Sequence, residues 1–216
     1  MPTRRTSRGS AASERSVTRR STAKPRSSVA PSGRFTTHEV DAERWRDFAR
    51  LFESQGGPKY CWCMVWRAEG AEARLADNAH RKAAMHRRVK QGTPVGLLGY
   101  LGDEPVAWCS IAPRETYRKG LGGLEAPDEA PGSVWSLACF FVTREARGQG
   151  VSRRLIKAAI THARKRGGKV LEAYPVDPDS PSYRFMGFVE TFEQLGFQGV
   201  GREGSRRHVY RYDLSA

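Results

Sequence analysis

The strongest hydrophobic pattern in the chain is a nearly unbroken apolar run from Val134 to Val142. Its length and its β-branched and aromatic residues predict a strand that is buried on both faces. After a short turn the pattern changes to helical spacing, which predicts a helix that extends to about Gly167. The apolar positions of this helix are Val151, Leu155, Ile156, Ala159, Ile160 and Ala163. We therefore predict that a strand, turn and helix form the centre of the fold.

The chain before this unit contains further strand and helix patterns. A strand is expected at Phe35–Val40, and Asp41 is the expected N-cap of a helix that carries Trp45 and Phe48. A second helix is expected at Ala71–Lys90. Two strands form a predicted hairpin around Gly102, at Pro94–Tyr100 and Pro105–Pro113.

After the central unit, strand patterns return. The expected elements are a strand at Lys169–Tyr174, a helical segment at Tyr183–Leu195, and closing strands at Val200 and His208–Leu214. The connection Arg114–Pro131 carries glycines and prolines, and it is either a substrate loop or a surface excursion. This mixture of strands and helices indicates an α/β fold.

The turn between the central strand and helix has the composition of an anion site. A glycine turn before a helix N-terminus directs unpaired backbone N–H groups toward one point, and the helix dipole favours negative charge there. Arg147 can add a charged contact beside Gly148 and Gly150. No Lys-Ser or Lys-Thr follows these glycines, which excludes the phosphate loop of NTPases. Arg153 stands where a dinucleotide fingerprint needs its third glycine.

The sequence Arg147-Gly148-Gln149-Gly150-Val151-Ser152 resembles the acetyl-CoA loop of the GNAT N-acetyltransferases, Arg/Gln-x-x-Gly-x-Gly/Ala. Ser152 stands where that family usually has Gly or Ala. Further on, Phe192-Glu-Gln-Leu-Gly196-Phe197 resembles the family's Tyr-x-x-x-Gly-Phe ending. The resemblance implies a mixed central sheet of about six or seven strands, helices on both faces, and a cofactor cleft where the fourth and fifth strands splay apart. It places a GNAT domain at residues 35–216, after a separate segment at 1–34.

The resemblance also implies where acetyl-CoA binds as co-substrate. The backbone of Phe140, Phe141 and Val142 is expected to pair with the pantetheine amides, and an N–H near Val142 to stabilise the oxyanion. The residues expected to hold the pyrophosphate are Arg147, Gly148, Gln149, Gly150, Val151 and Ser152. No metal is expected.

The proton-transfer groups are less directly implied. Phe192 occupies the place of the family's tyrosine and cannot donate a proton. The candidate catalytic residues are therefore Glu172 and Tyr183, with Tyr174 and Asp177 as neighbouring alternatives. A strand carboxylate such as Glu172 is also a common salt-bridge partner.

An unusual heptapeptide, Cys61-Trp62-Cys63-Met64-Val65-Trp66-Arg67, follows the first predicted helix. In the GNAT frame this segment lies between the first two helices, which wall the acceptor site. Trp62 and Trp66 therefore either line the acceptor pocket or pack beneath the helices. Cys61 and Cys63 could begin a zinc site, but Cys109 and Cys139 lack the paired spacing that would complete one.

Charge is unevenly distributed. Residues 1–34 carry nine Arg or Lys against one acid, so they hold 9 − 1 = +8 of the net charge of +14. This composition predicts disorder, and it could bind nucleic acid or acidic surfaces without sequence preference, or simply be solvated. The four cysteines do not form a secreted framework, and no apolar run could span a membrane. A cytoplasmic location is expected.

The sequence therefore predicts an N-acetyltransferase that moves an acetyl group from acetyl-CoA to a primary amine by direct attack in a ternary complex. Phe192 supports an alternative, a catalytically silent acyl-CoA sensor. A third hypothesis is a nucleic-acid-associated protein that acts through its basic tail. The acceptor, a small molecule or a protein amine, and the oligomeric state stay open.

Overall fold

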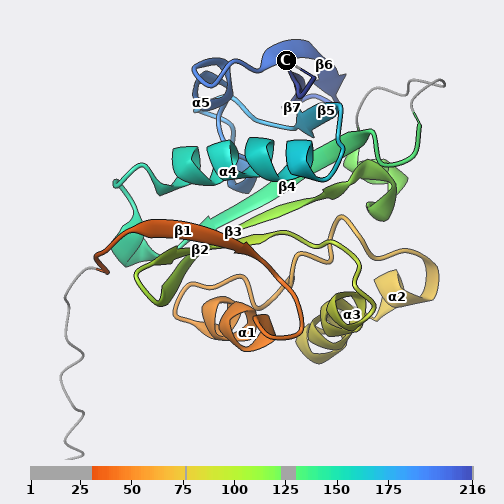
Figure 1. The fold of residues 1–216 in the computed structure, drawn as a ribbon. Helices are drawn as coiled ribbons and strands as arrows, with labels where there is room; N and C mark the ends of the chain where they lie inside the picture. Colours follow the sequence, from red (N-terminus) through yellow and green to blue (C-terminus); the bar gives the residue numbers. More distant parts are fainter. Residues whose placement is uncertain (1–30, 76, 123–129, 216) are drawn as a thin grey trace, which may run out of the picture.

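The computed structural model describes residues 31–75, 77–122 and 130–215. The predicted disorder of residues 1–34, and any nucleic-acid binding by them, falls almost wholly outside this part and stays a prediction. The described chain forms a seven-stranded sheet with the order β1-β2-β3-β4-β5-β7-β6 (Figure 1). Its strands are β1 Phe35–Glu39, β2 Leu97–Leu101, β3 Glu104–Pro113, β4 Val134–Val142, β5 Val170–Ala173, β6 Gln198–Glu203 and β7 Arg207–Asp213.

Helices cover both faces of the sheet. The α-helices are α1 Trp45–Glu53, α2 Gly70–Arg74, α3 Asn78–Lys90, α4 Val151–Lys165 and α5 Val189–Glu193. Short 3-10 turns are η1 Arg114–Thr116, η2 Lys119–Leu121, η3 Arg144–Ala146 and η4 Arg184–Met186. Figure 1 shows α4 along one face and α1 and α3 along the other. The predicted mixed sheet with helices on both faces is confirmed.

The side chains of β3 alternate between the two faces of the sheet and contribute to a hydrophobic core on each face. Successive strand side chains point to opposite faces, so Trp108 packs with α1 while Cys109 belongs to the core under α4. The Trp108 and Phe48 rings are 4.8 Å apart between centroids, in an edge-to-face arrangement. On the other face, Leu155 of α4 is fully buried. Each such fully buried large apolar side chain stabilises the fold by roughly 1.5–3 kcal/mol.

The two central strands separate halfway along their length. β4 and β5 run parallel, and only Val134–Leu137 of β4 pairs with Val170–Ala173. On its other edge β4 stays paired with β3 as far as Val142. Burial follows the same division, because 134–138 are buried and 139–142 are half-buried. The predicted splayed cleft is therefore present, and the second half of β4 faces it.

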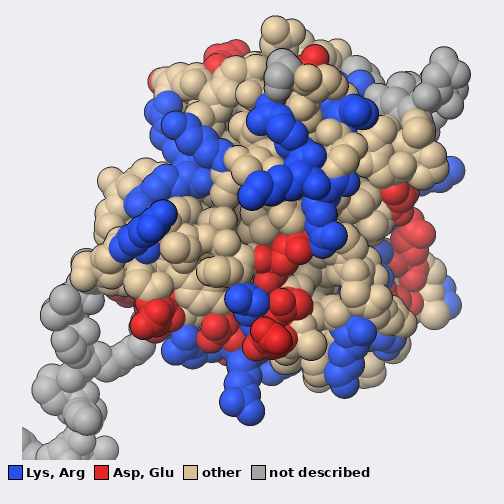
Figure 2. All heavy atoms as spheres, viewed as in Figure 1, with Lys and Arg blue, Asp and Glu red and all other residues tan. Residues whose placement is uncertain are grey.

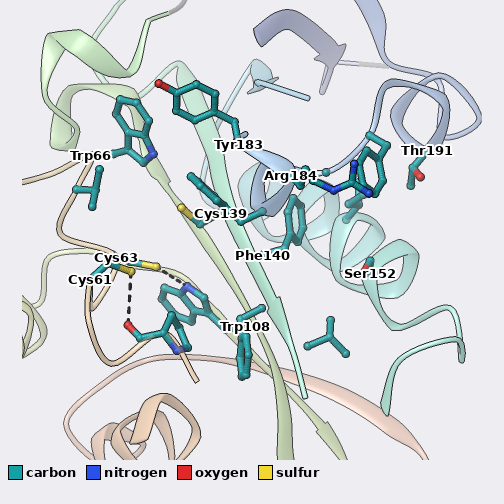
Figure 3. A pocket seen from close by; sticks show the side chains of 18 of the residues that line it. Cys61, Cys63, Trp66, Trp108, Cys139, Phe140, Ser152, Tyr183, Arg184 and Thr191 are labelled. Atoms are coloured by element: carbon teal, nitrogen blue, oxygen red, sulfur yellow. Dashed lines mark hydrogen bonds between the residues drawn. The ribbon is translucent and has the colours of Figure 1, made fainter. Parts of the chain in front are cut away.

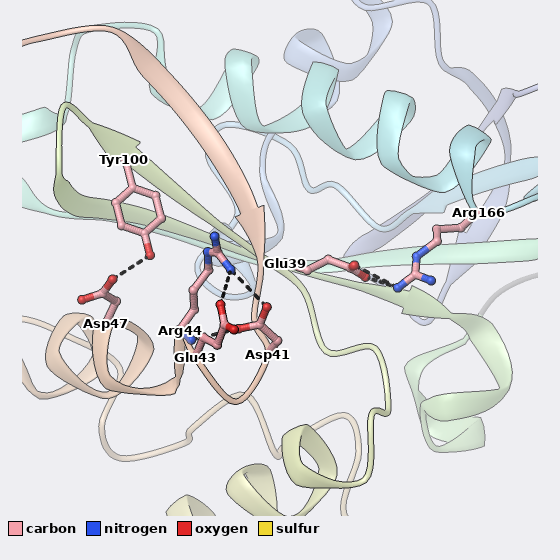
Figure 4. A network of polar contacts seen from close by, with 7 residues as sticks. All are labelled: Glu39, Asp41, Glu43, Arg44, Asp47, Tyr100 and Arg166. Atoms are coloured by element: carbon pink, nitrogen blue, oxygen red, sulfur yellow. Dashed lines mark hydrogen bonds and ion pairs between the residues drawn. The ribbon is translucent and has the colours of Figure 1, made fainter.

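Three predicted helices differ in extent from the structure, and the segment expected at 183–195 is helical only at η4 and α5. The Ala71–Lys90 pattern forms two helices, because Asp77 caps α3 by accepting the His80 backbone N–H at 2.9 Å. The first helix begins at Trp45, not directly after Asp41. Asp41 instead accepts the Arg44 backbone N–H at 2.9 Å and pairs with its guanidinium, so it caps the turn that precedes α1 (Figure 4).

The face that carries α4 is basic. Figure 2 shows Lys and Arg gathered over α4, where Arg153, Lys157 and Arg164 are exposed, above a smaller acidic group. Glu39 of β1 accepts from Arg166 just beyond α4, at 2.6 and 2.9 Å (Figure 4). None of the helices in the described ranges has the length and apolar character needed to cross a bilayer.

Candidate active site

A cavity of about 890 Å³ occupies the place where β4 and β5 part. Three segments enclose it: the second half of β4, the loop that contains Cys61 and Trp66, and residues 183–192 after β5 (Figure 3). One end reaches Arg147 and Ser152 at the start of α4. The other reaches Trp66 and Arg118, so the cavity joins the glycine turn to the loop before α2.

Backbone conformation explains the two glycines of the turn. Gly148 has φ +74° and Gly150 has φ +69°, and a Cβ at either position would meet no atom within 4 Å. Glycine is therefore required by the left-handed backbone and not by crowding. Two side chains order the turn: Gln149 donates to the Glu145 carbonyl at 3.1 Å, and Arg154 donates to the Gln149 carbonyl at 2.8 Å.

The turn has the features of an anion site. α4 begins at Val151 with no acidic residue in its first turn and no side-chain cap, so its first N–H groups are open to a ligand. A hollow of about 230 Å³ lies against them, lined in part by Gly148, Gly150 and Val151. Ser152 lines both this hollow and the large cavity. The residues present fit a pyrophosphate.

Most of the residues predicted to bind the cofactor lie at these two hollows. Those on the large cavity are Phe140, Phe141, Val142, Arg147 and Ser152. Arg147 donates from Nε to the Val142 carbonyl at 3.1 Å, which ties the turn to the end of β4. Gln149 lines neither hollow, and its side chain orders the turn. Thr191 faces both hollows, and no motif in the sequence singled it out.

The two candidate catalytic residues are not brought together. Tyr183 lines the cavity, and Figure 3 shows its hydroxyl above Trp66, on the side away from Phe140. Glu172 is fully buried in β5 and does not line the cavity. Its carboxylate accepts from the Tyr174 hydroxyl at 2.7 Å and from Arg211 Nε at 2.8 Å.

The two tryptophans of the heptapeptide have different surroundings. Trp62 is 2% exposed and stacks with Phe52 at 5.4 Å between ring centroids, beneath α1. It does not line the cavity, which fits the interpretation that it packs under the helices. Trp66 is 5% exposed and does line the cavity. The sequence could not show which tryptophan lines the cavity, because the difference arises from a turn of the chain between them. Trp62 and Cys63 form this turn with left-handed backbone, at φ +47° and +51°.

Three thiols meet in the cavity wall. Cys63 accepts from Trp108 Nε1 at 3.1 Å, and Cys61 and Cys139 line the same region. A hydrogen bond with Cys139, together with burial, raises the pKa of Cys63 well above its ordinary value. A hydrogen bond with Cys63 and burial raise the pKa of Cys61 as well. All four cysteines are free, and no set of ligands for a metal occurs in the described residues. The sequence spacing did not reveal that Cys139 of β4 joins the first two.

The charged residues of the cavity wall are all arginines. Arg118, Arg147 and Arg184 line it, and among the described residues no Asp, Glu or His does. Arg118 lies in the predicted connection Arg114–Pro131, which therefore contributes to the cavity. No motif identified this arginine in the sequence, because its position depends on contacts with Trp66, far away in the chain.

Comparisons with known proteins agree with this geometry. The model of the acetyltransferase (GNAT) family matches residues 39–188. A search of curated proteins gave no match.

Solved structures show the same fold at low identity. The protein yncA from Salmonella typhimurium, solved with its cofactor acetyl-CoA, is 19% identical with a TM-score of 0.50 and covers 83% of this chain and 94% of its own. The ribosomal-protein-S5-alanine acetyltransferase from Vibrio fischeri is 11% identical with a TM-score of 0.52, covering 83% and 93%. An N-acetyltransferase from Staphylococcus aureus is 12% identical with a TM-score of 0.51, covering 85% and 100%.

Proposed function

Because this chain belongs to the GNAT acetyltransferase family, we propose that it transfers an acetyl group from acetyl-CoA to the primary amine of an acceptor, by direct attack in a ternary complex. The observation that carries the proposal is the continuous cavity from the glycine turn to Trp66, through the gap between β4 and β5. Such a passage lets a phosphate-bearing thioester and an amine enter from opposite ends and meet at the second half of β4.

Acetyl-CoA supplies an activated acyl group and a good leaving group. Attack by the neutral amine on the thioester carbonyl forms the C–N bond and breaks the C–S bond. One proton passes from the amine nitrogen to water, and the released thiolate takes up one proton.

The chain's contribution is mainly positional and electrostatic. The first N–H groups of α4 and Arg147 are proposed to hold the pyrophosphate, which fixes the thioester beside β4. Backbone N–H groups near Val142 are proposed to stabilise the developing oxyanion, since this part of β4 lacks a β5 partner.

Phe192 excludes itself as the proton donor to the leaving thiolate, so the proton must come from another group or from water. It is fully buried against Phe197, 5.0 Å between ring centroids, and offers no hydroxyl to the leaving sulfur. We propose that the Tyr183 hydroxyl, at the acceptor end of the cavity, takes part in proton transfer. Tyr183→Phe is therefore expected to lower turnover while leaving acetyl-CoA binding unchanged. The same Phe192 supports the alternative function, an acyl-CoA sensor without turnover.

The test measures thiol release from acetyl-CoA with a panel of amines, and acetyl-CoA binding by calorimetry. Gly150→Trp is expected to abolish both, because the indole fills the pyrophosphate turn. Gly204→Trp is the matched control: Gly204 lies between β6 and β7 with φ +63° and equally open surroundings, so it carries the same backbone strain away from the cavity.

The possible outcomes distinguish the two functions. Thiol release by wild type and Gly204→Trp, with none by Gly150→Trp, would support the proposal. Tight binding without thiol release for any amine would favour the sensor. Equal binding by wild type and Gly150→Trp would reject the proposed cofactor site.

A further inference from the structure

Aromatic and guanidinium groups enclose the end of the cavity farthest from the glycine turn. Two arginines lie against the Trp66 ring: Arg118 Cζ is 5.0 Å from its centroid and Arg207 Cζ is 4.7 Å. Arg207 also lies 5.3 Å from the Tyr183 ring centroid. These contacts hold Trp66 and the two guanidinium groups in fixed positions around one small region.

Two hydrogen-bond donors in this region have no acceptor. The indole nitrogen of Trp66 and Nε of Arg118 are both buried, and neither has a partner among the described residues. Figure 3 shows the Trp66 nitrogen on the side of the ring that faces Tyr183 and Cys139, inside the cavity. A buried donor without an acceptor is costly, so native structures normally satisfy it with a ligand, water or protein group. Both donors therefore point to a missing acceptor atom.

The charge around these donors is positive. Arg67, the residue after Trp66, is 3% exposed and donates to neutral groups: the Val95 carbonyl at 3.0 Å, the Ser110 hydroxyl at 3.1 Å and the Thr116 hydroxyl at 3.3 Å. Arg207 has Glu203 at 3.8 Å. In the described part of the chain, this is the only carboxylate that pairs with Arg67, Arg118 or Arg207. Low-dielectric walls strengthen the resulting positive potential.

We propose that the acceptor is a primary amine that also carries a carboxylate, as an amino acid does, and that Arg118 and the Trp66 indole N–H bind this carboxylate. This inference rests on the proposed acetyl transfer. The carboxylate supplies the acceptor oxygens that the two donors lack and the negative charge that the arginines favour. The amine then faces the second half of β4, where the thioester is expected. Polyamines and other polycationic acceptors are disfavoured by the same potential.

The experiment compares acceptors that differ only in the carboxylate. Thiol release is measured for the standard L-amino acids, their amides and the corresponding decarboxylated amines, with rates expressed per neutral amine because the amine pKa differs among them. Wild type is expected to prefer at least one acid over its amide by about tenfold or more in kcat/KM. A charge-assisted hydrogen bond accounts for a ratio of that size.

Three variants locate the effect. Arg118→Gln is expected to lower kcat/KM for the acid about tenfold and leave the amide unchanged. Trp66→Phe, which removes the N–H and keeps an aromatic ring, is expected to act in the same direction. Lys119→Gln is the control, because Lys119 is exposed and does not line the cavity. The substitution removes the same charge one residue away from Arg118. It should leave the ratio unchanged.

A second measurement separates this inference from the proposed function. Calorimetry of the same amino acids and amides on protein saturated with CoA reports carboxylate binding without turnover. If the protein binds the acids more tightly than the amides, and Arg118→Gln abolishes this difference, the inference is supported even when no thiol is released. In that case only the proposed acetyl transfer is rejected. Thiol release with equal rates for acids and amides, or a preference for spermidine, would overturn the inference while acetyl transfer stands.

Discussion

Glu172 illustrates how one residue can fit a catalytic and a structural role from sequence, and how its surroundings separate them. Its fully buried carboxylate accepts from Tyr174 and Arg211, and Arg114 lies 3.6 Å away. It also lies outside the cavity wall. The arrangement is that of a charge network around one fully buried carboxylate, in which removing the central charge weakens several contacts at once.

We predict that Glu172→Gln lowers the free energy of unfolding by about 2–3 kcal/mol, because the arginines lose a charged acceptor. Urea unfolding measures this change. Glu104→Gln, at the exposed first residue of β3, is the control and should stay within about 0.5 kcal/mol of wild type. A large loss of kcat with wild-type stability would instead support the catalytic role of Glu172.

At the scale of elements, α2 depends on a single side chain. This five-residue helix has no buried residue, so packing contributes little to it. Glu72 of α2 pairs with Arg88 at 2.6 Å and with Arg87 at 2.8 Å, both on α3. The Arg88 guanidinium, followed by Arg87, lowers the pKa of Glu72 below its ordinary value. The helix is therefore held to α3 by ion pairs.

We predict that Glu72→Gln increases amide hydrogen exchange at residues 70–74 and leaves α3 unchanged. Because the folded pKa of Glu72 is lowered, its stabilising effect is present above its ordinary pKa and is lost as the pH falls through the lowered value. Acidification of wild type should therefore reproduce the effect of the variant. Glu69→Gln, at the neighbouring position where the side chain makes no cap, is the control; if it behaves like Glu72→Gln, the ion pairs with α3 are not the cause.

The same elements show how far sequence patterns reach. Apolar patterns predicted the central strand and the central helix, since their apolar positions repeat at the periods that buried faces require. The exposed strand β6 carries no such pattern, and only Val200 indicated it. It predicted one helix at 71–90 where there are two, because the Asp77 cap outweighs a continuous helical composition. The segment 183–195 is helical only at η4 and α5, since Gly187 with φ +89° interrupts it.

At the scale of the whole molecule, the composition of the cavity wall constrains catalysis. In the described chain, the wall contains three arginines and three cysteines but no Asp, Glu or His. For the proposed reaction, the described part of the wall therefore offers the acceptor ammonium no side chain with an ordinary pKa below neutrality to take its proton. We therefore propose that water is the base and that the neutral fraction of the amine limits the rate.

We predict that kcat/KM rises with pH until the pKa of the acceptor amine itself. Two acceptors with amine pKa values at least about one unit apart should give profiles displaced by that difference. Thiol release across the pH range measures this, with unfolding curves as the control for stability. Profiles that level off at one common pKa for both acceptors would contradict the prediction and reveal a titrating base in the protein.

The sequence by itself determined the fold, the family and the glycine turn before α4, because periodicity and glycine spacing are local properties of the chain. It also identified most of the residues that line the end of the cavity beside this turn, since Val142, Arg147 and Ser152 lie close together along the chain, but it missed Thr191. The acceptor end required the tertiary structure. Trp66, Arg118, Cys139 and Tyr183 come from four distant segments, and only the packing of those segments on β4 brings them to one cavity. The same packing placed Trp62 in the core and Glu172 behind the cavity wall, because burial and charge partners depend on neighbours that the order of residues does not reveal.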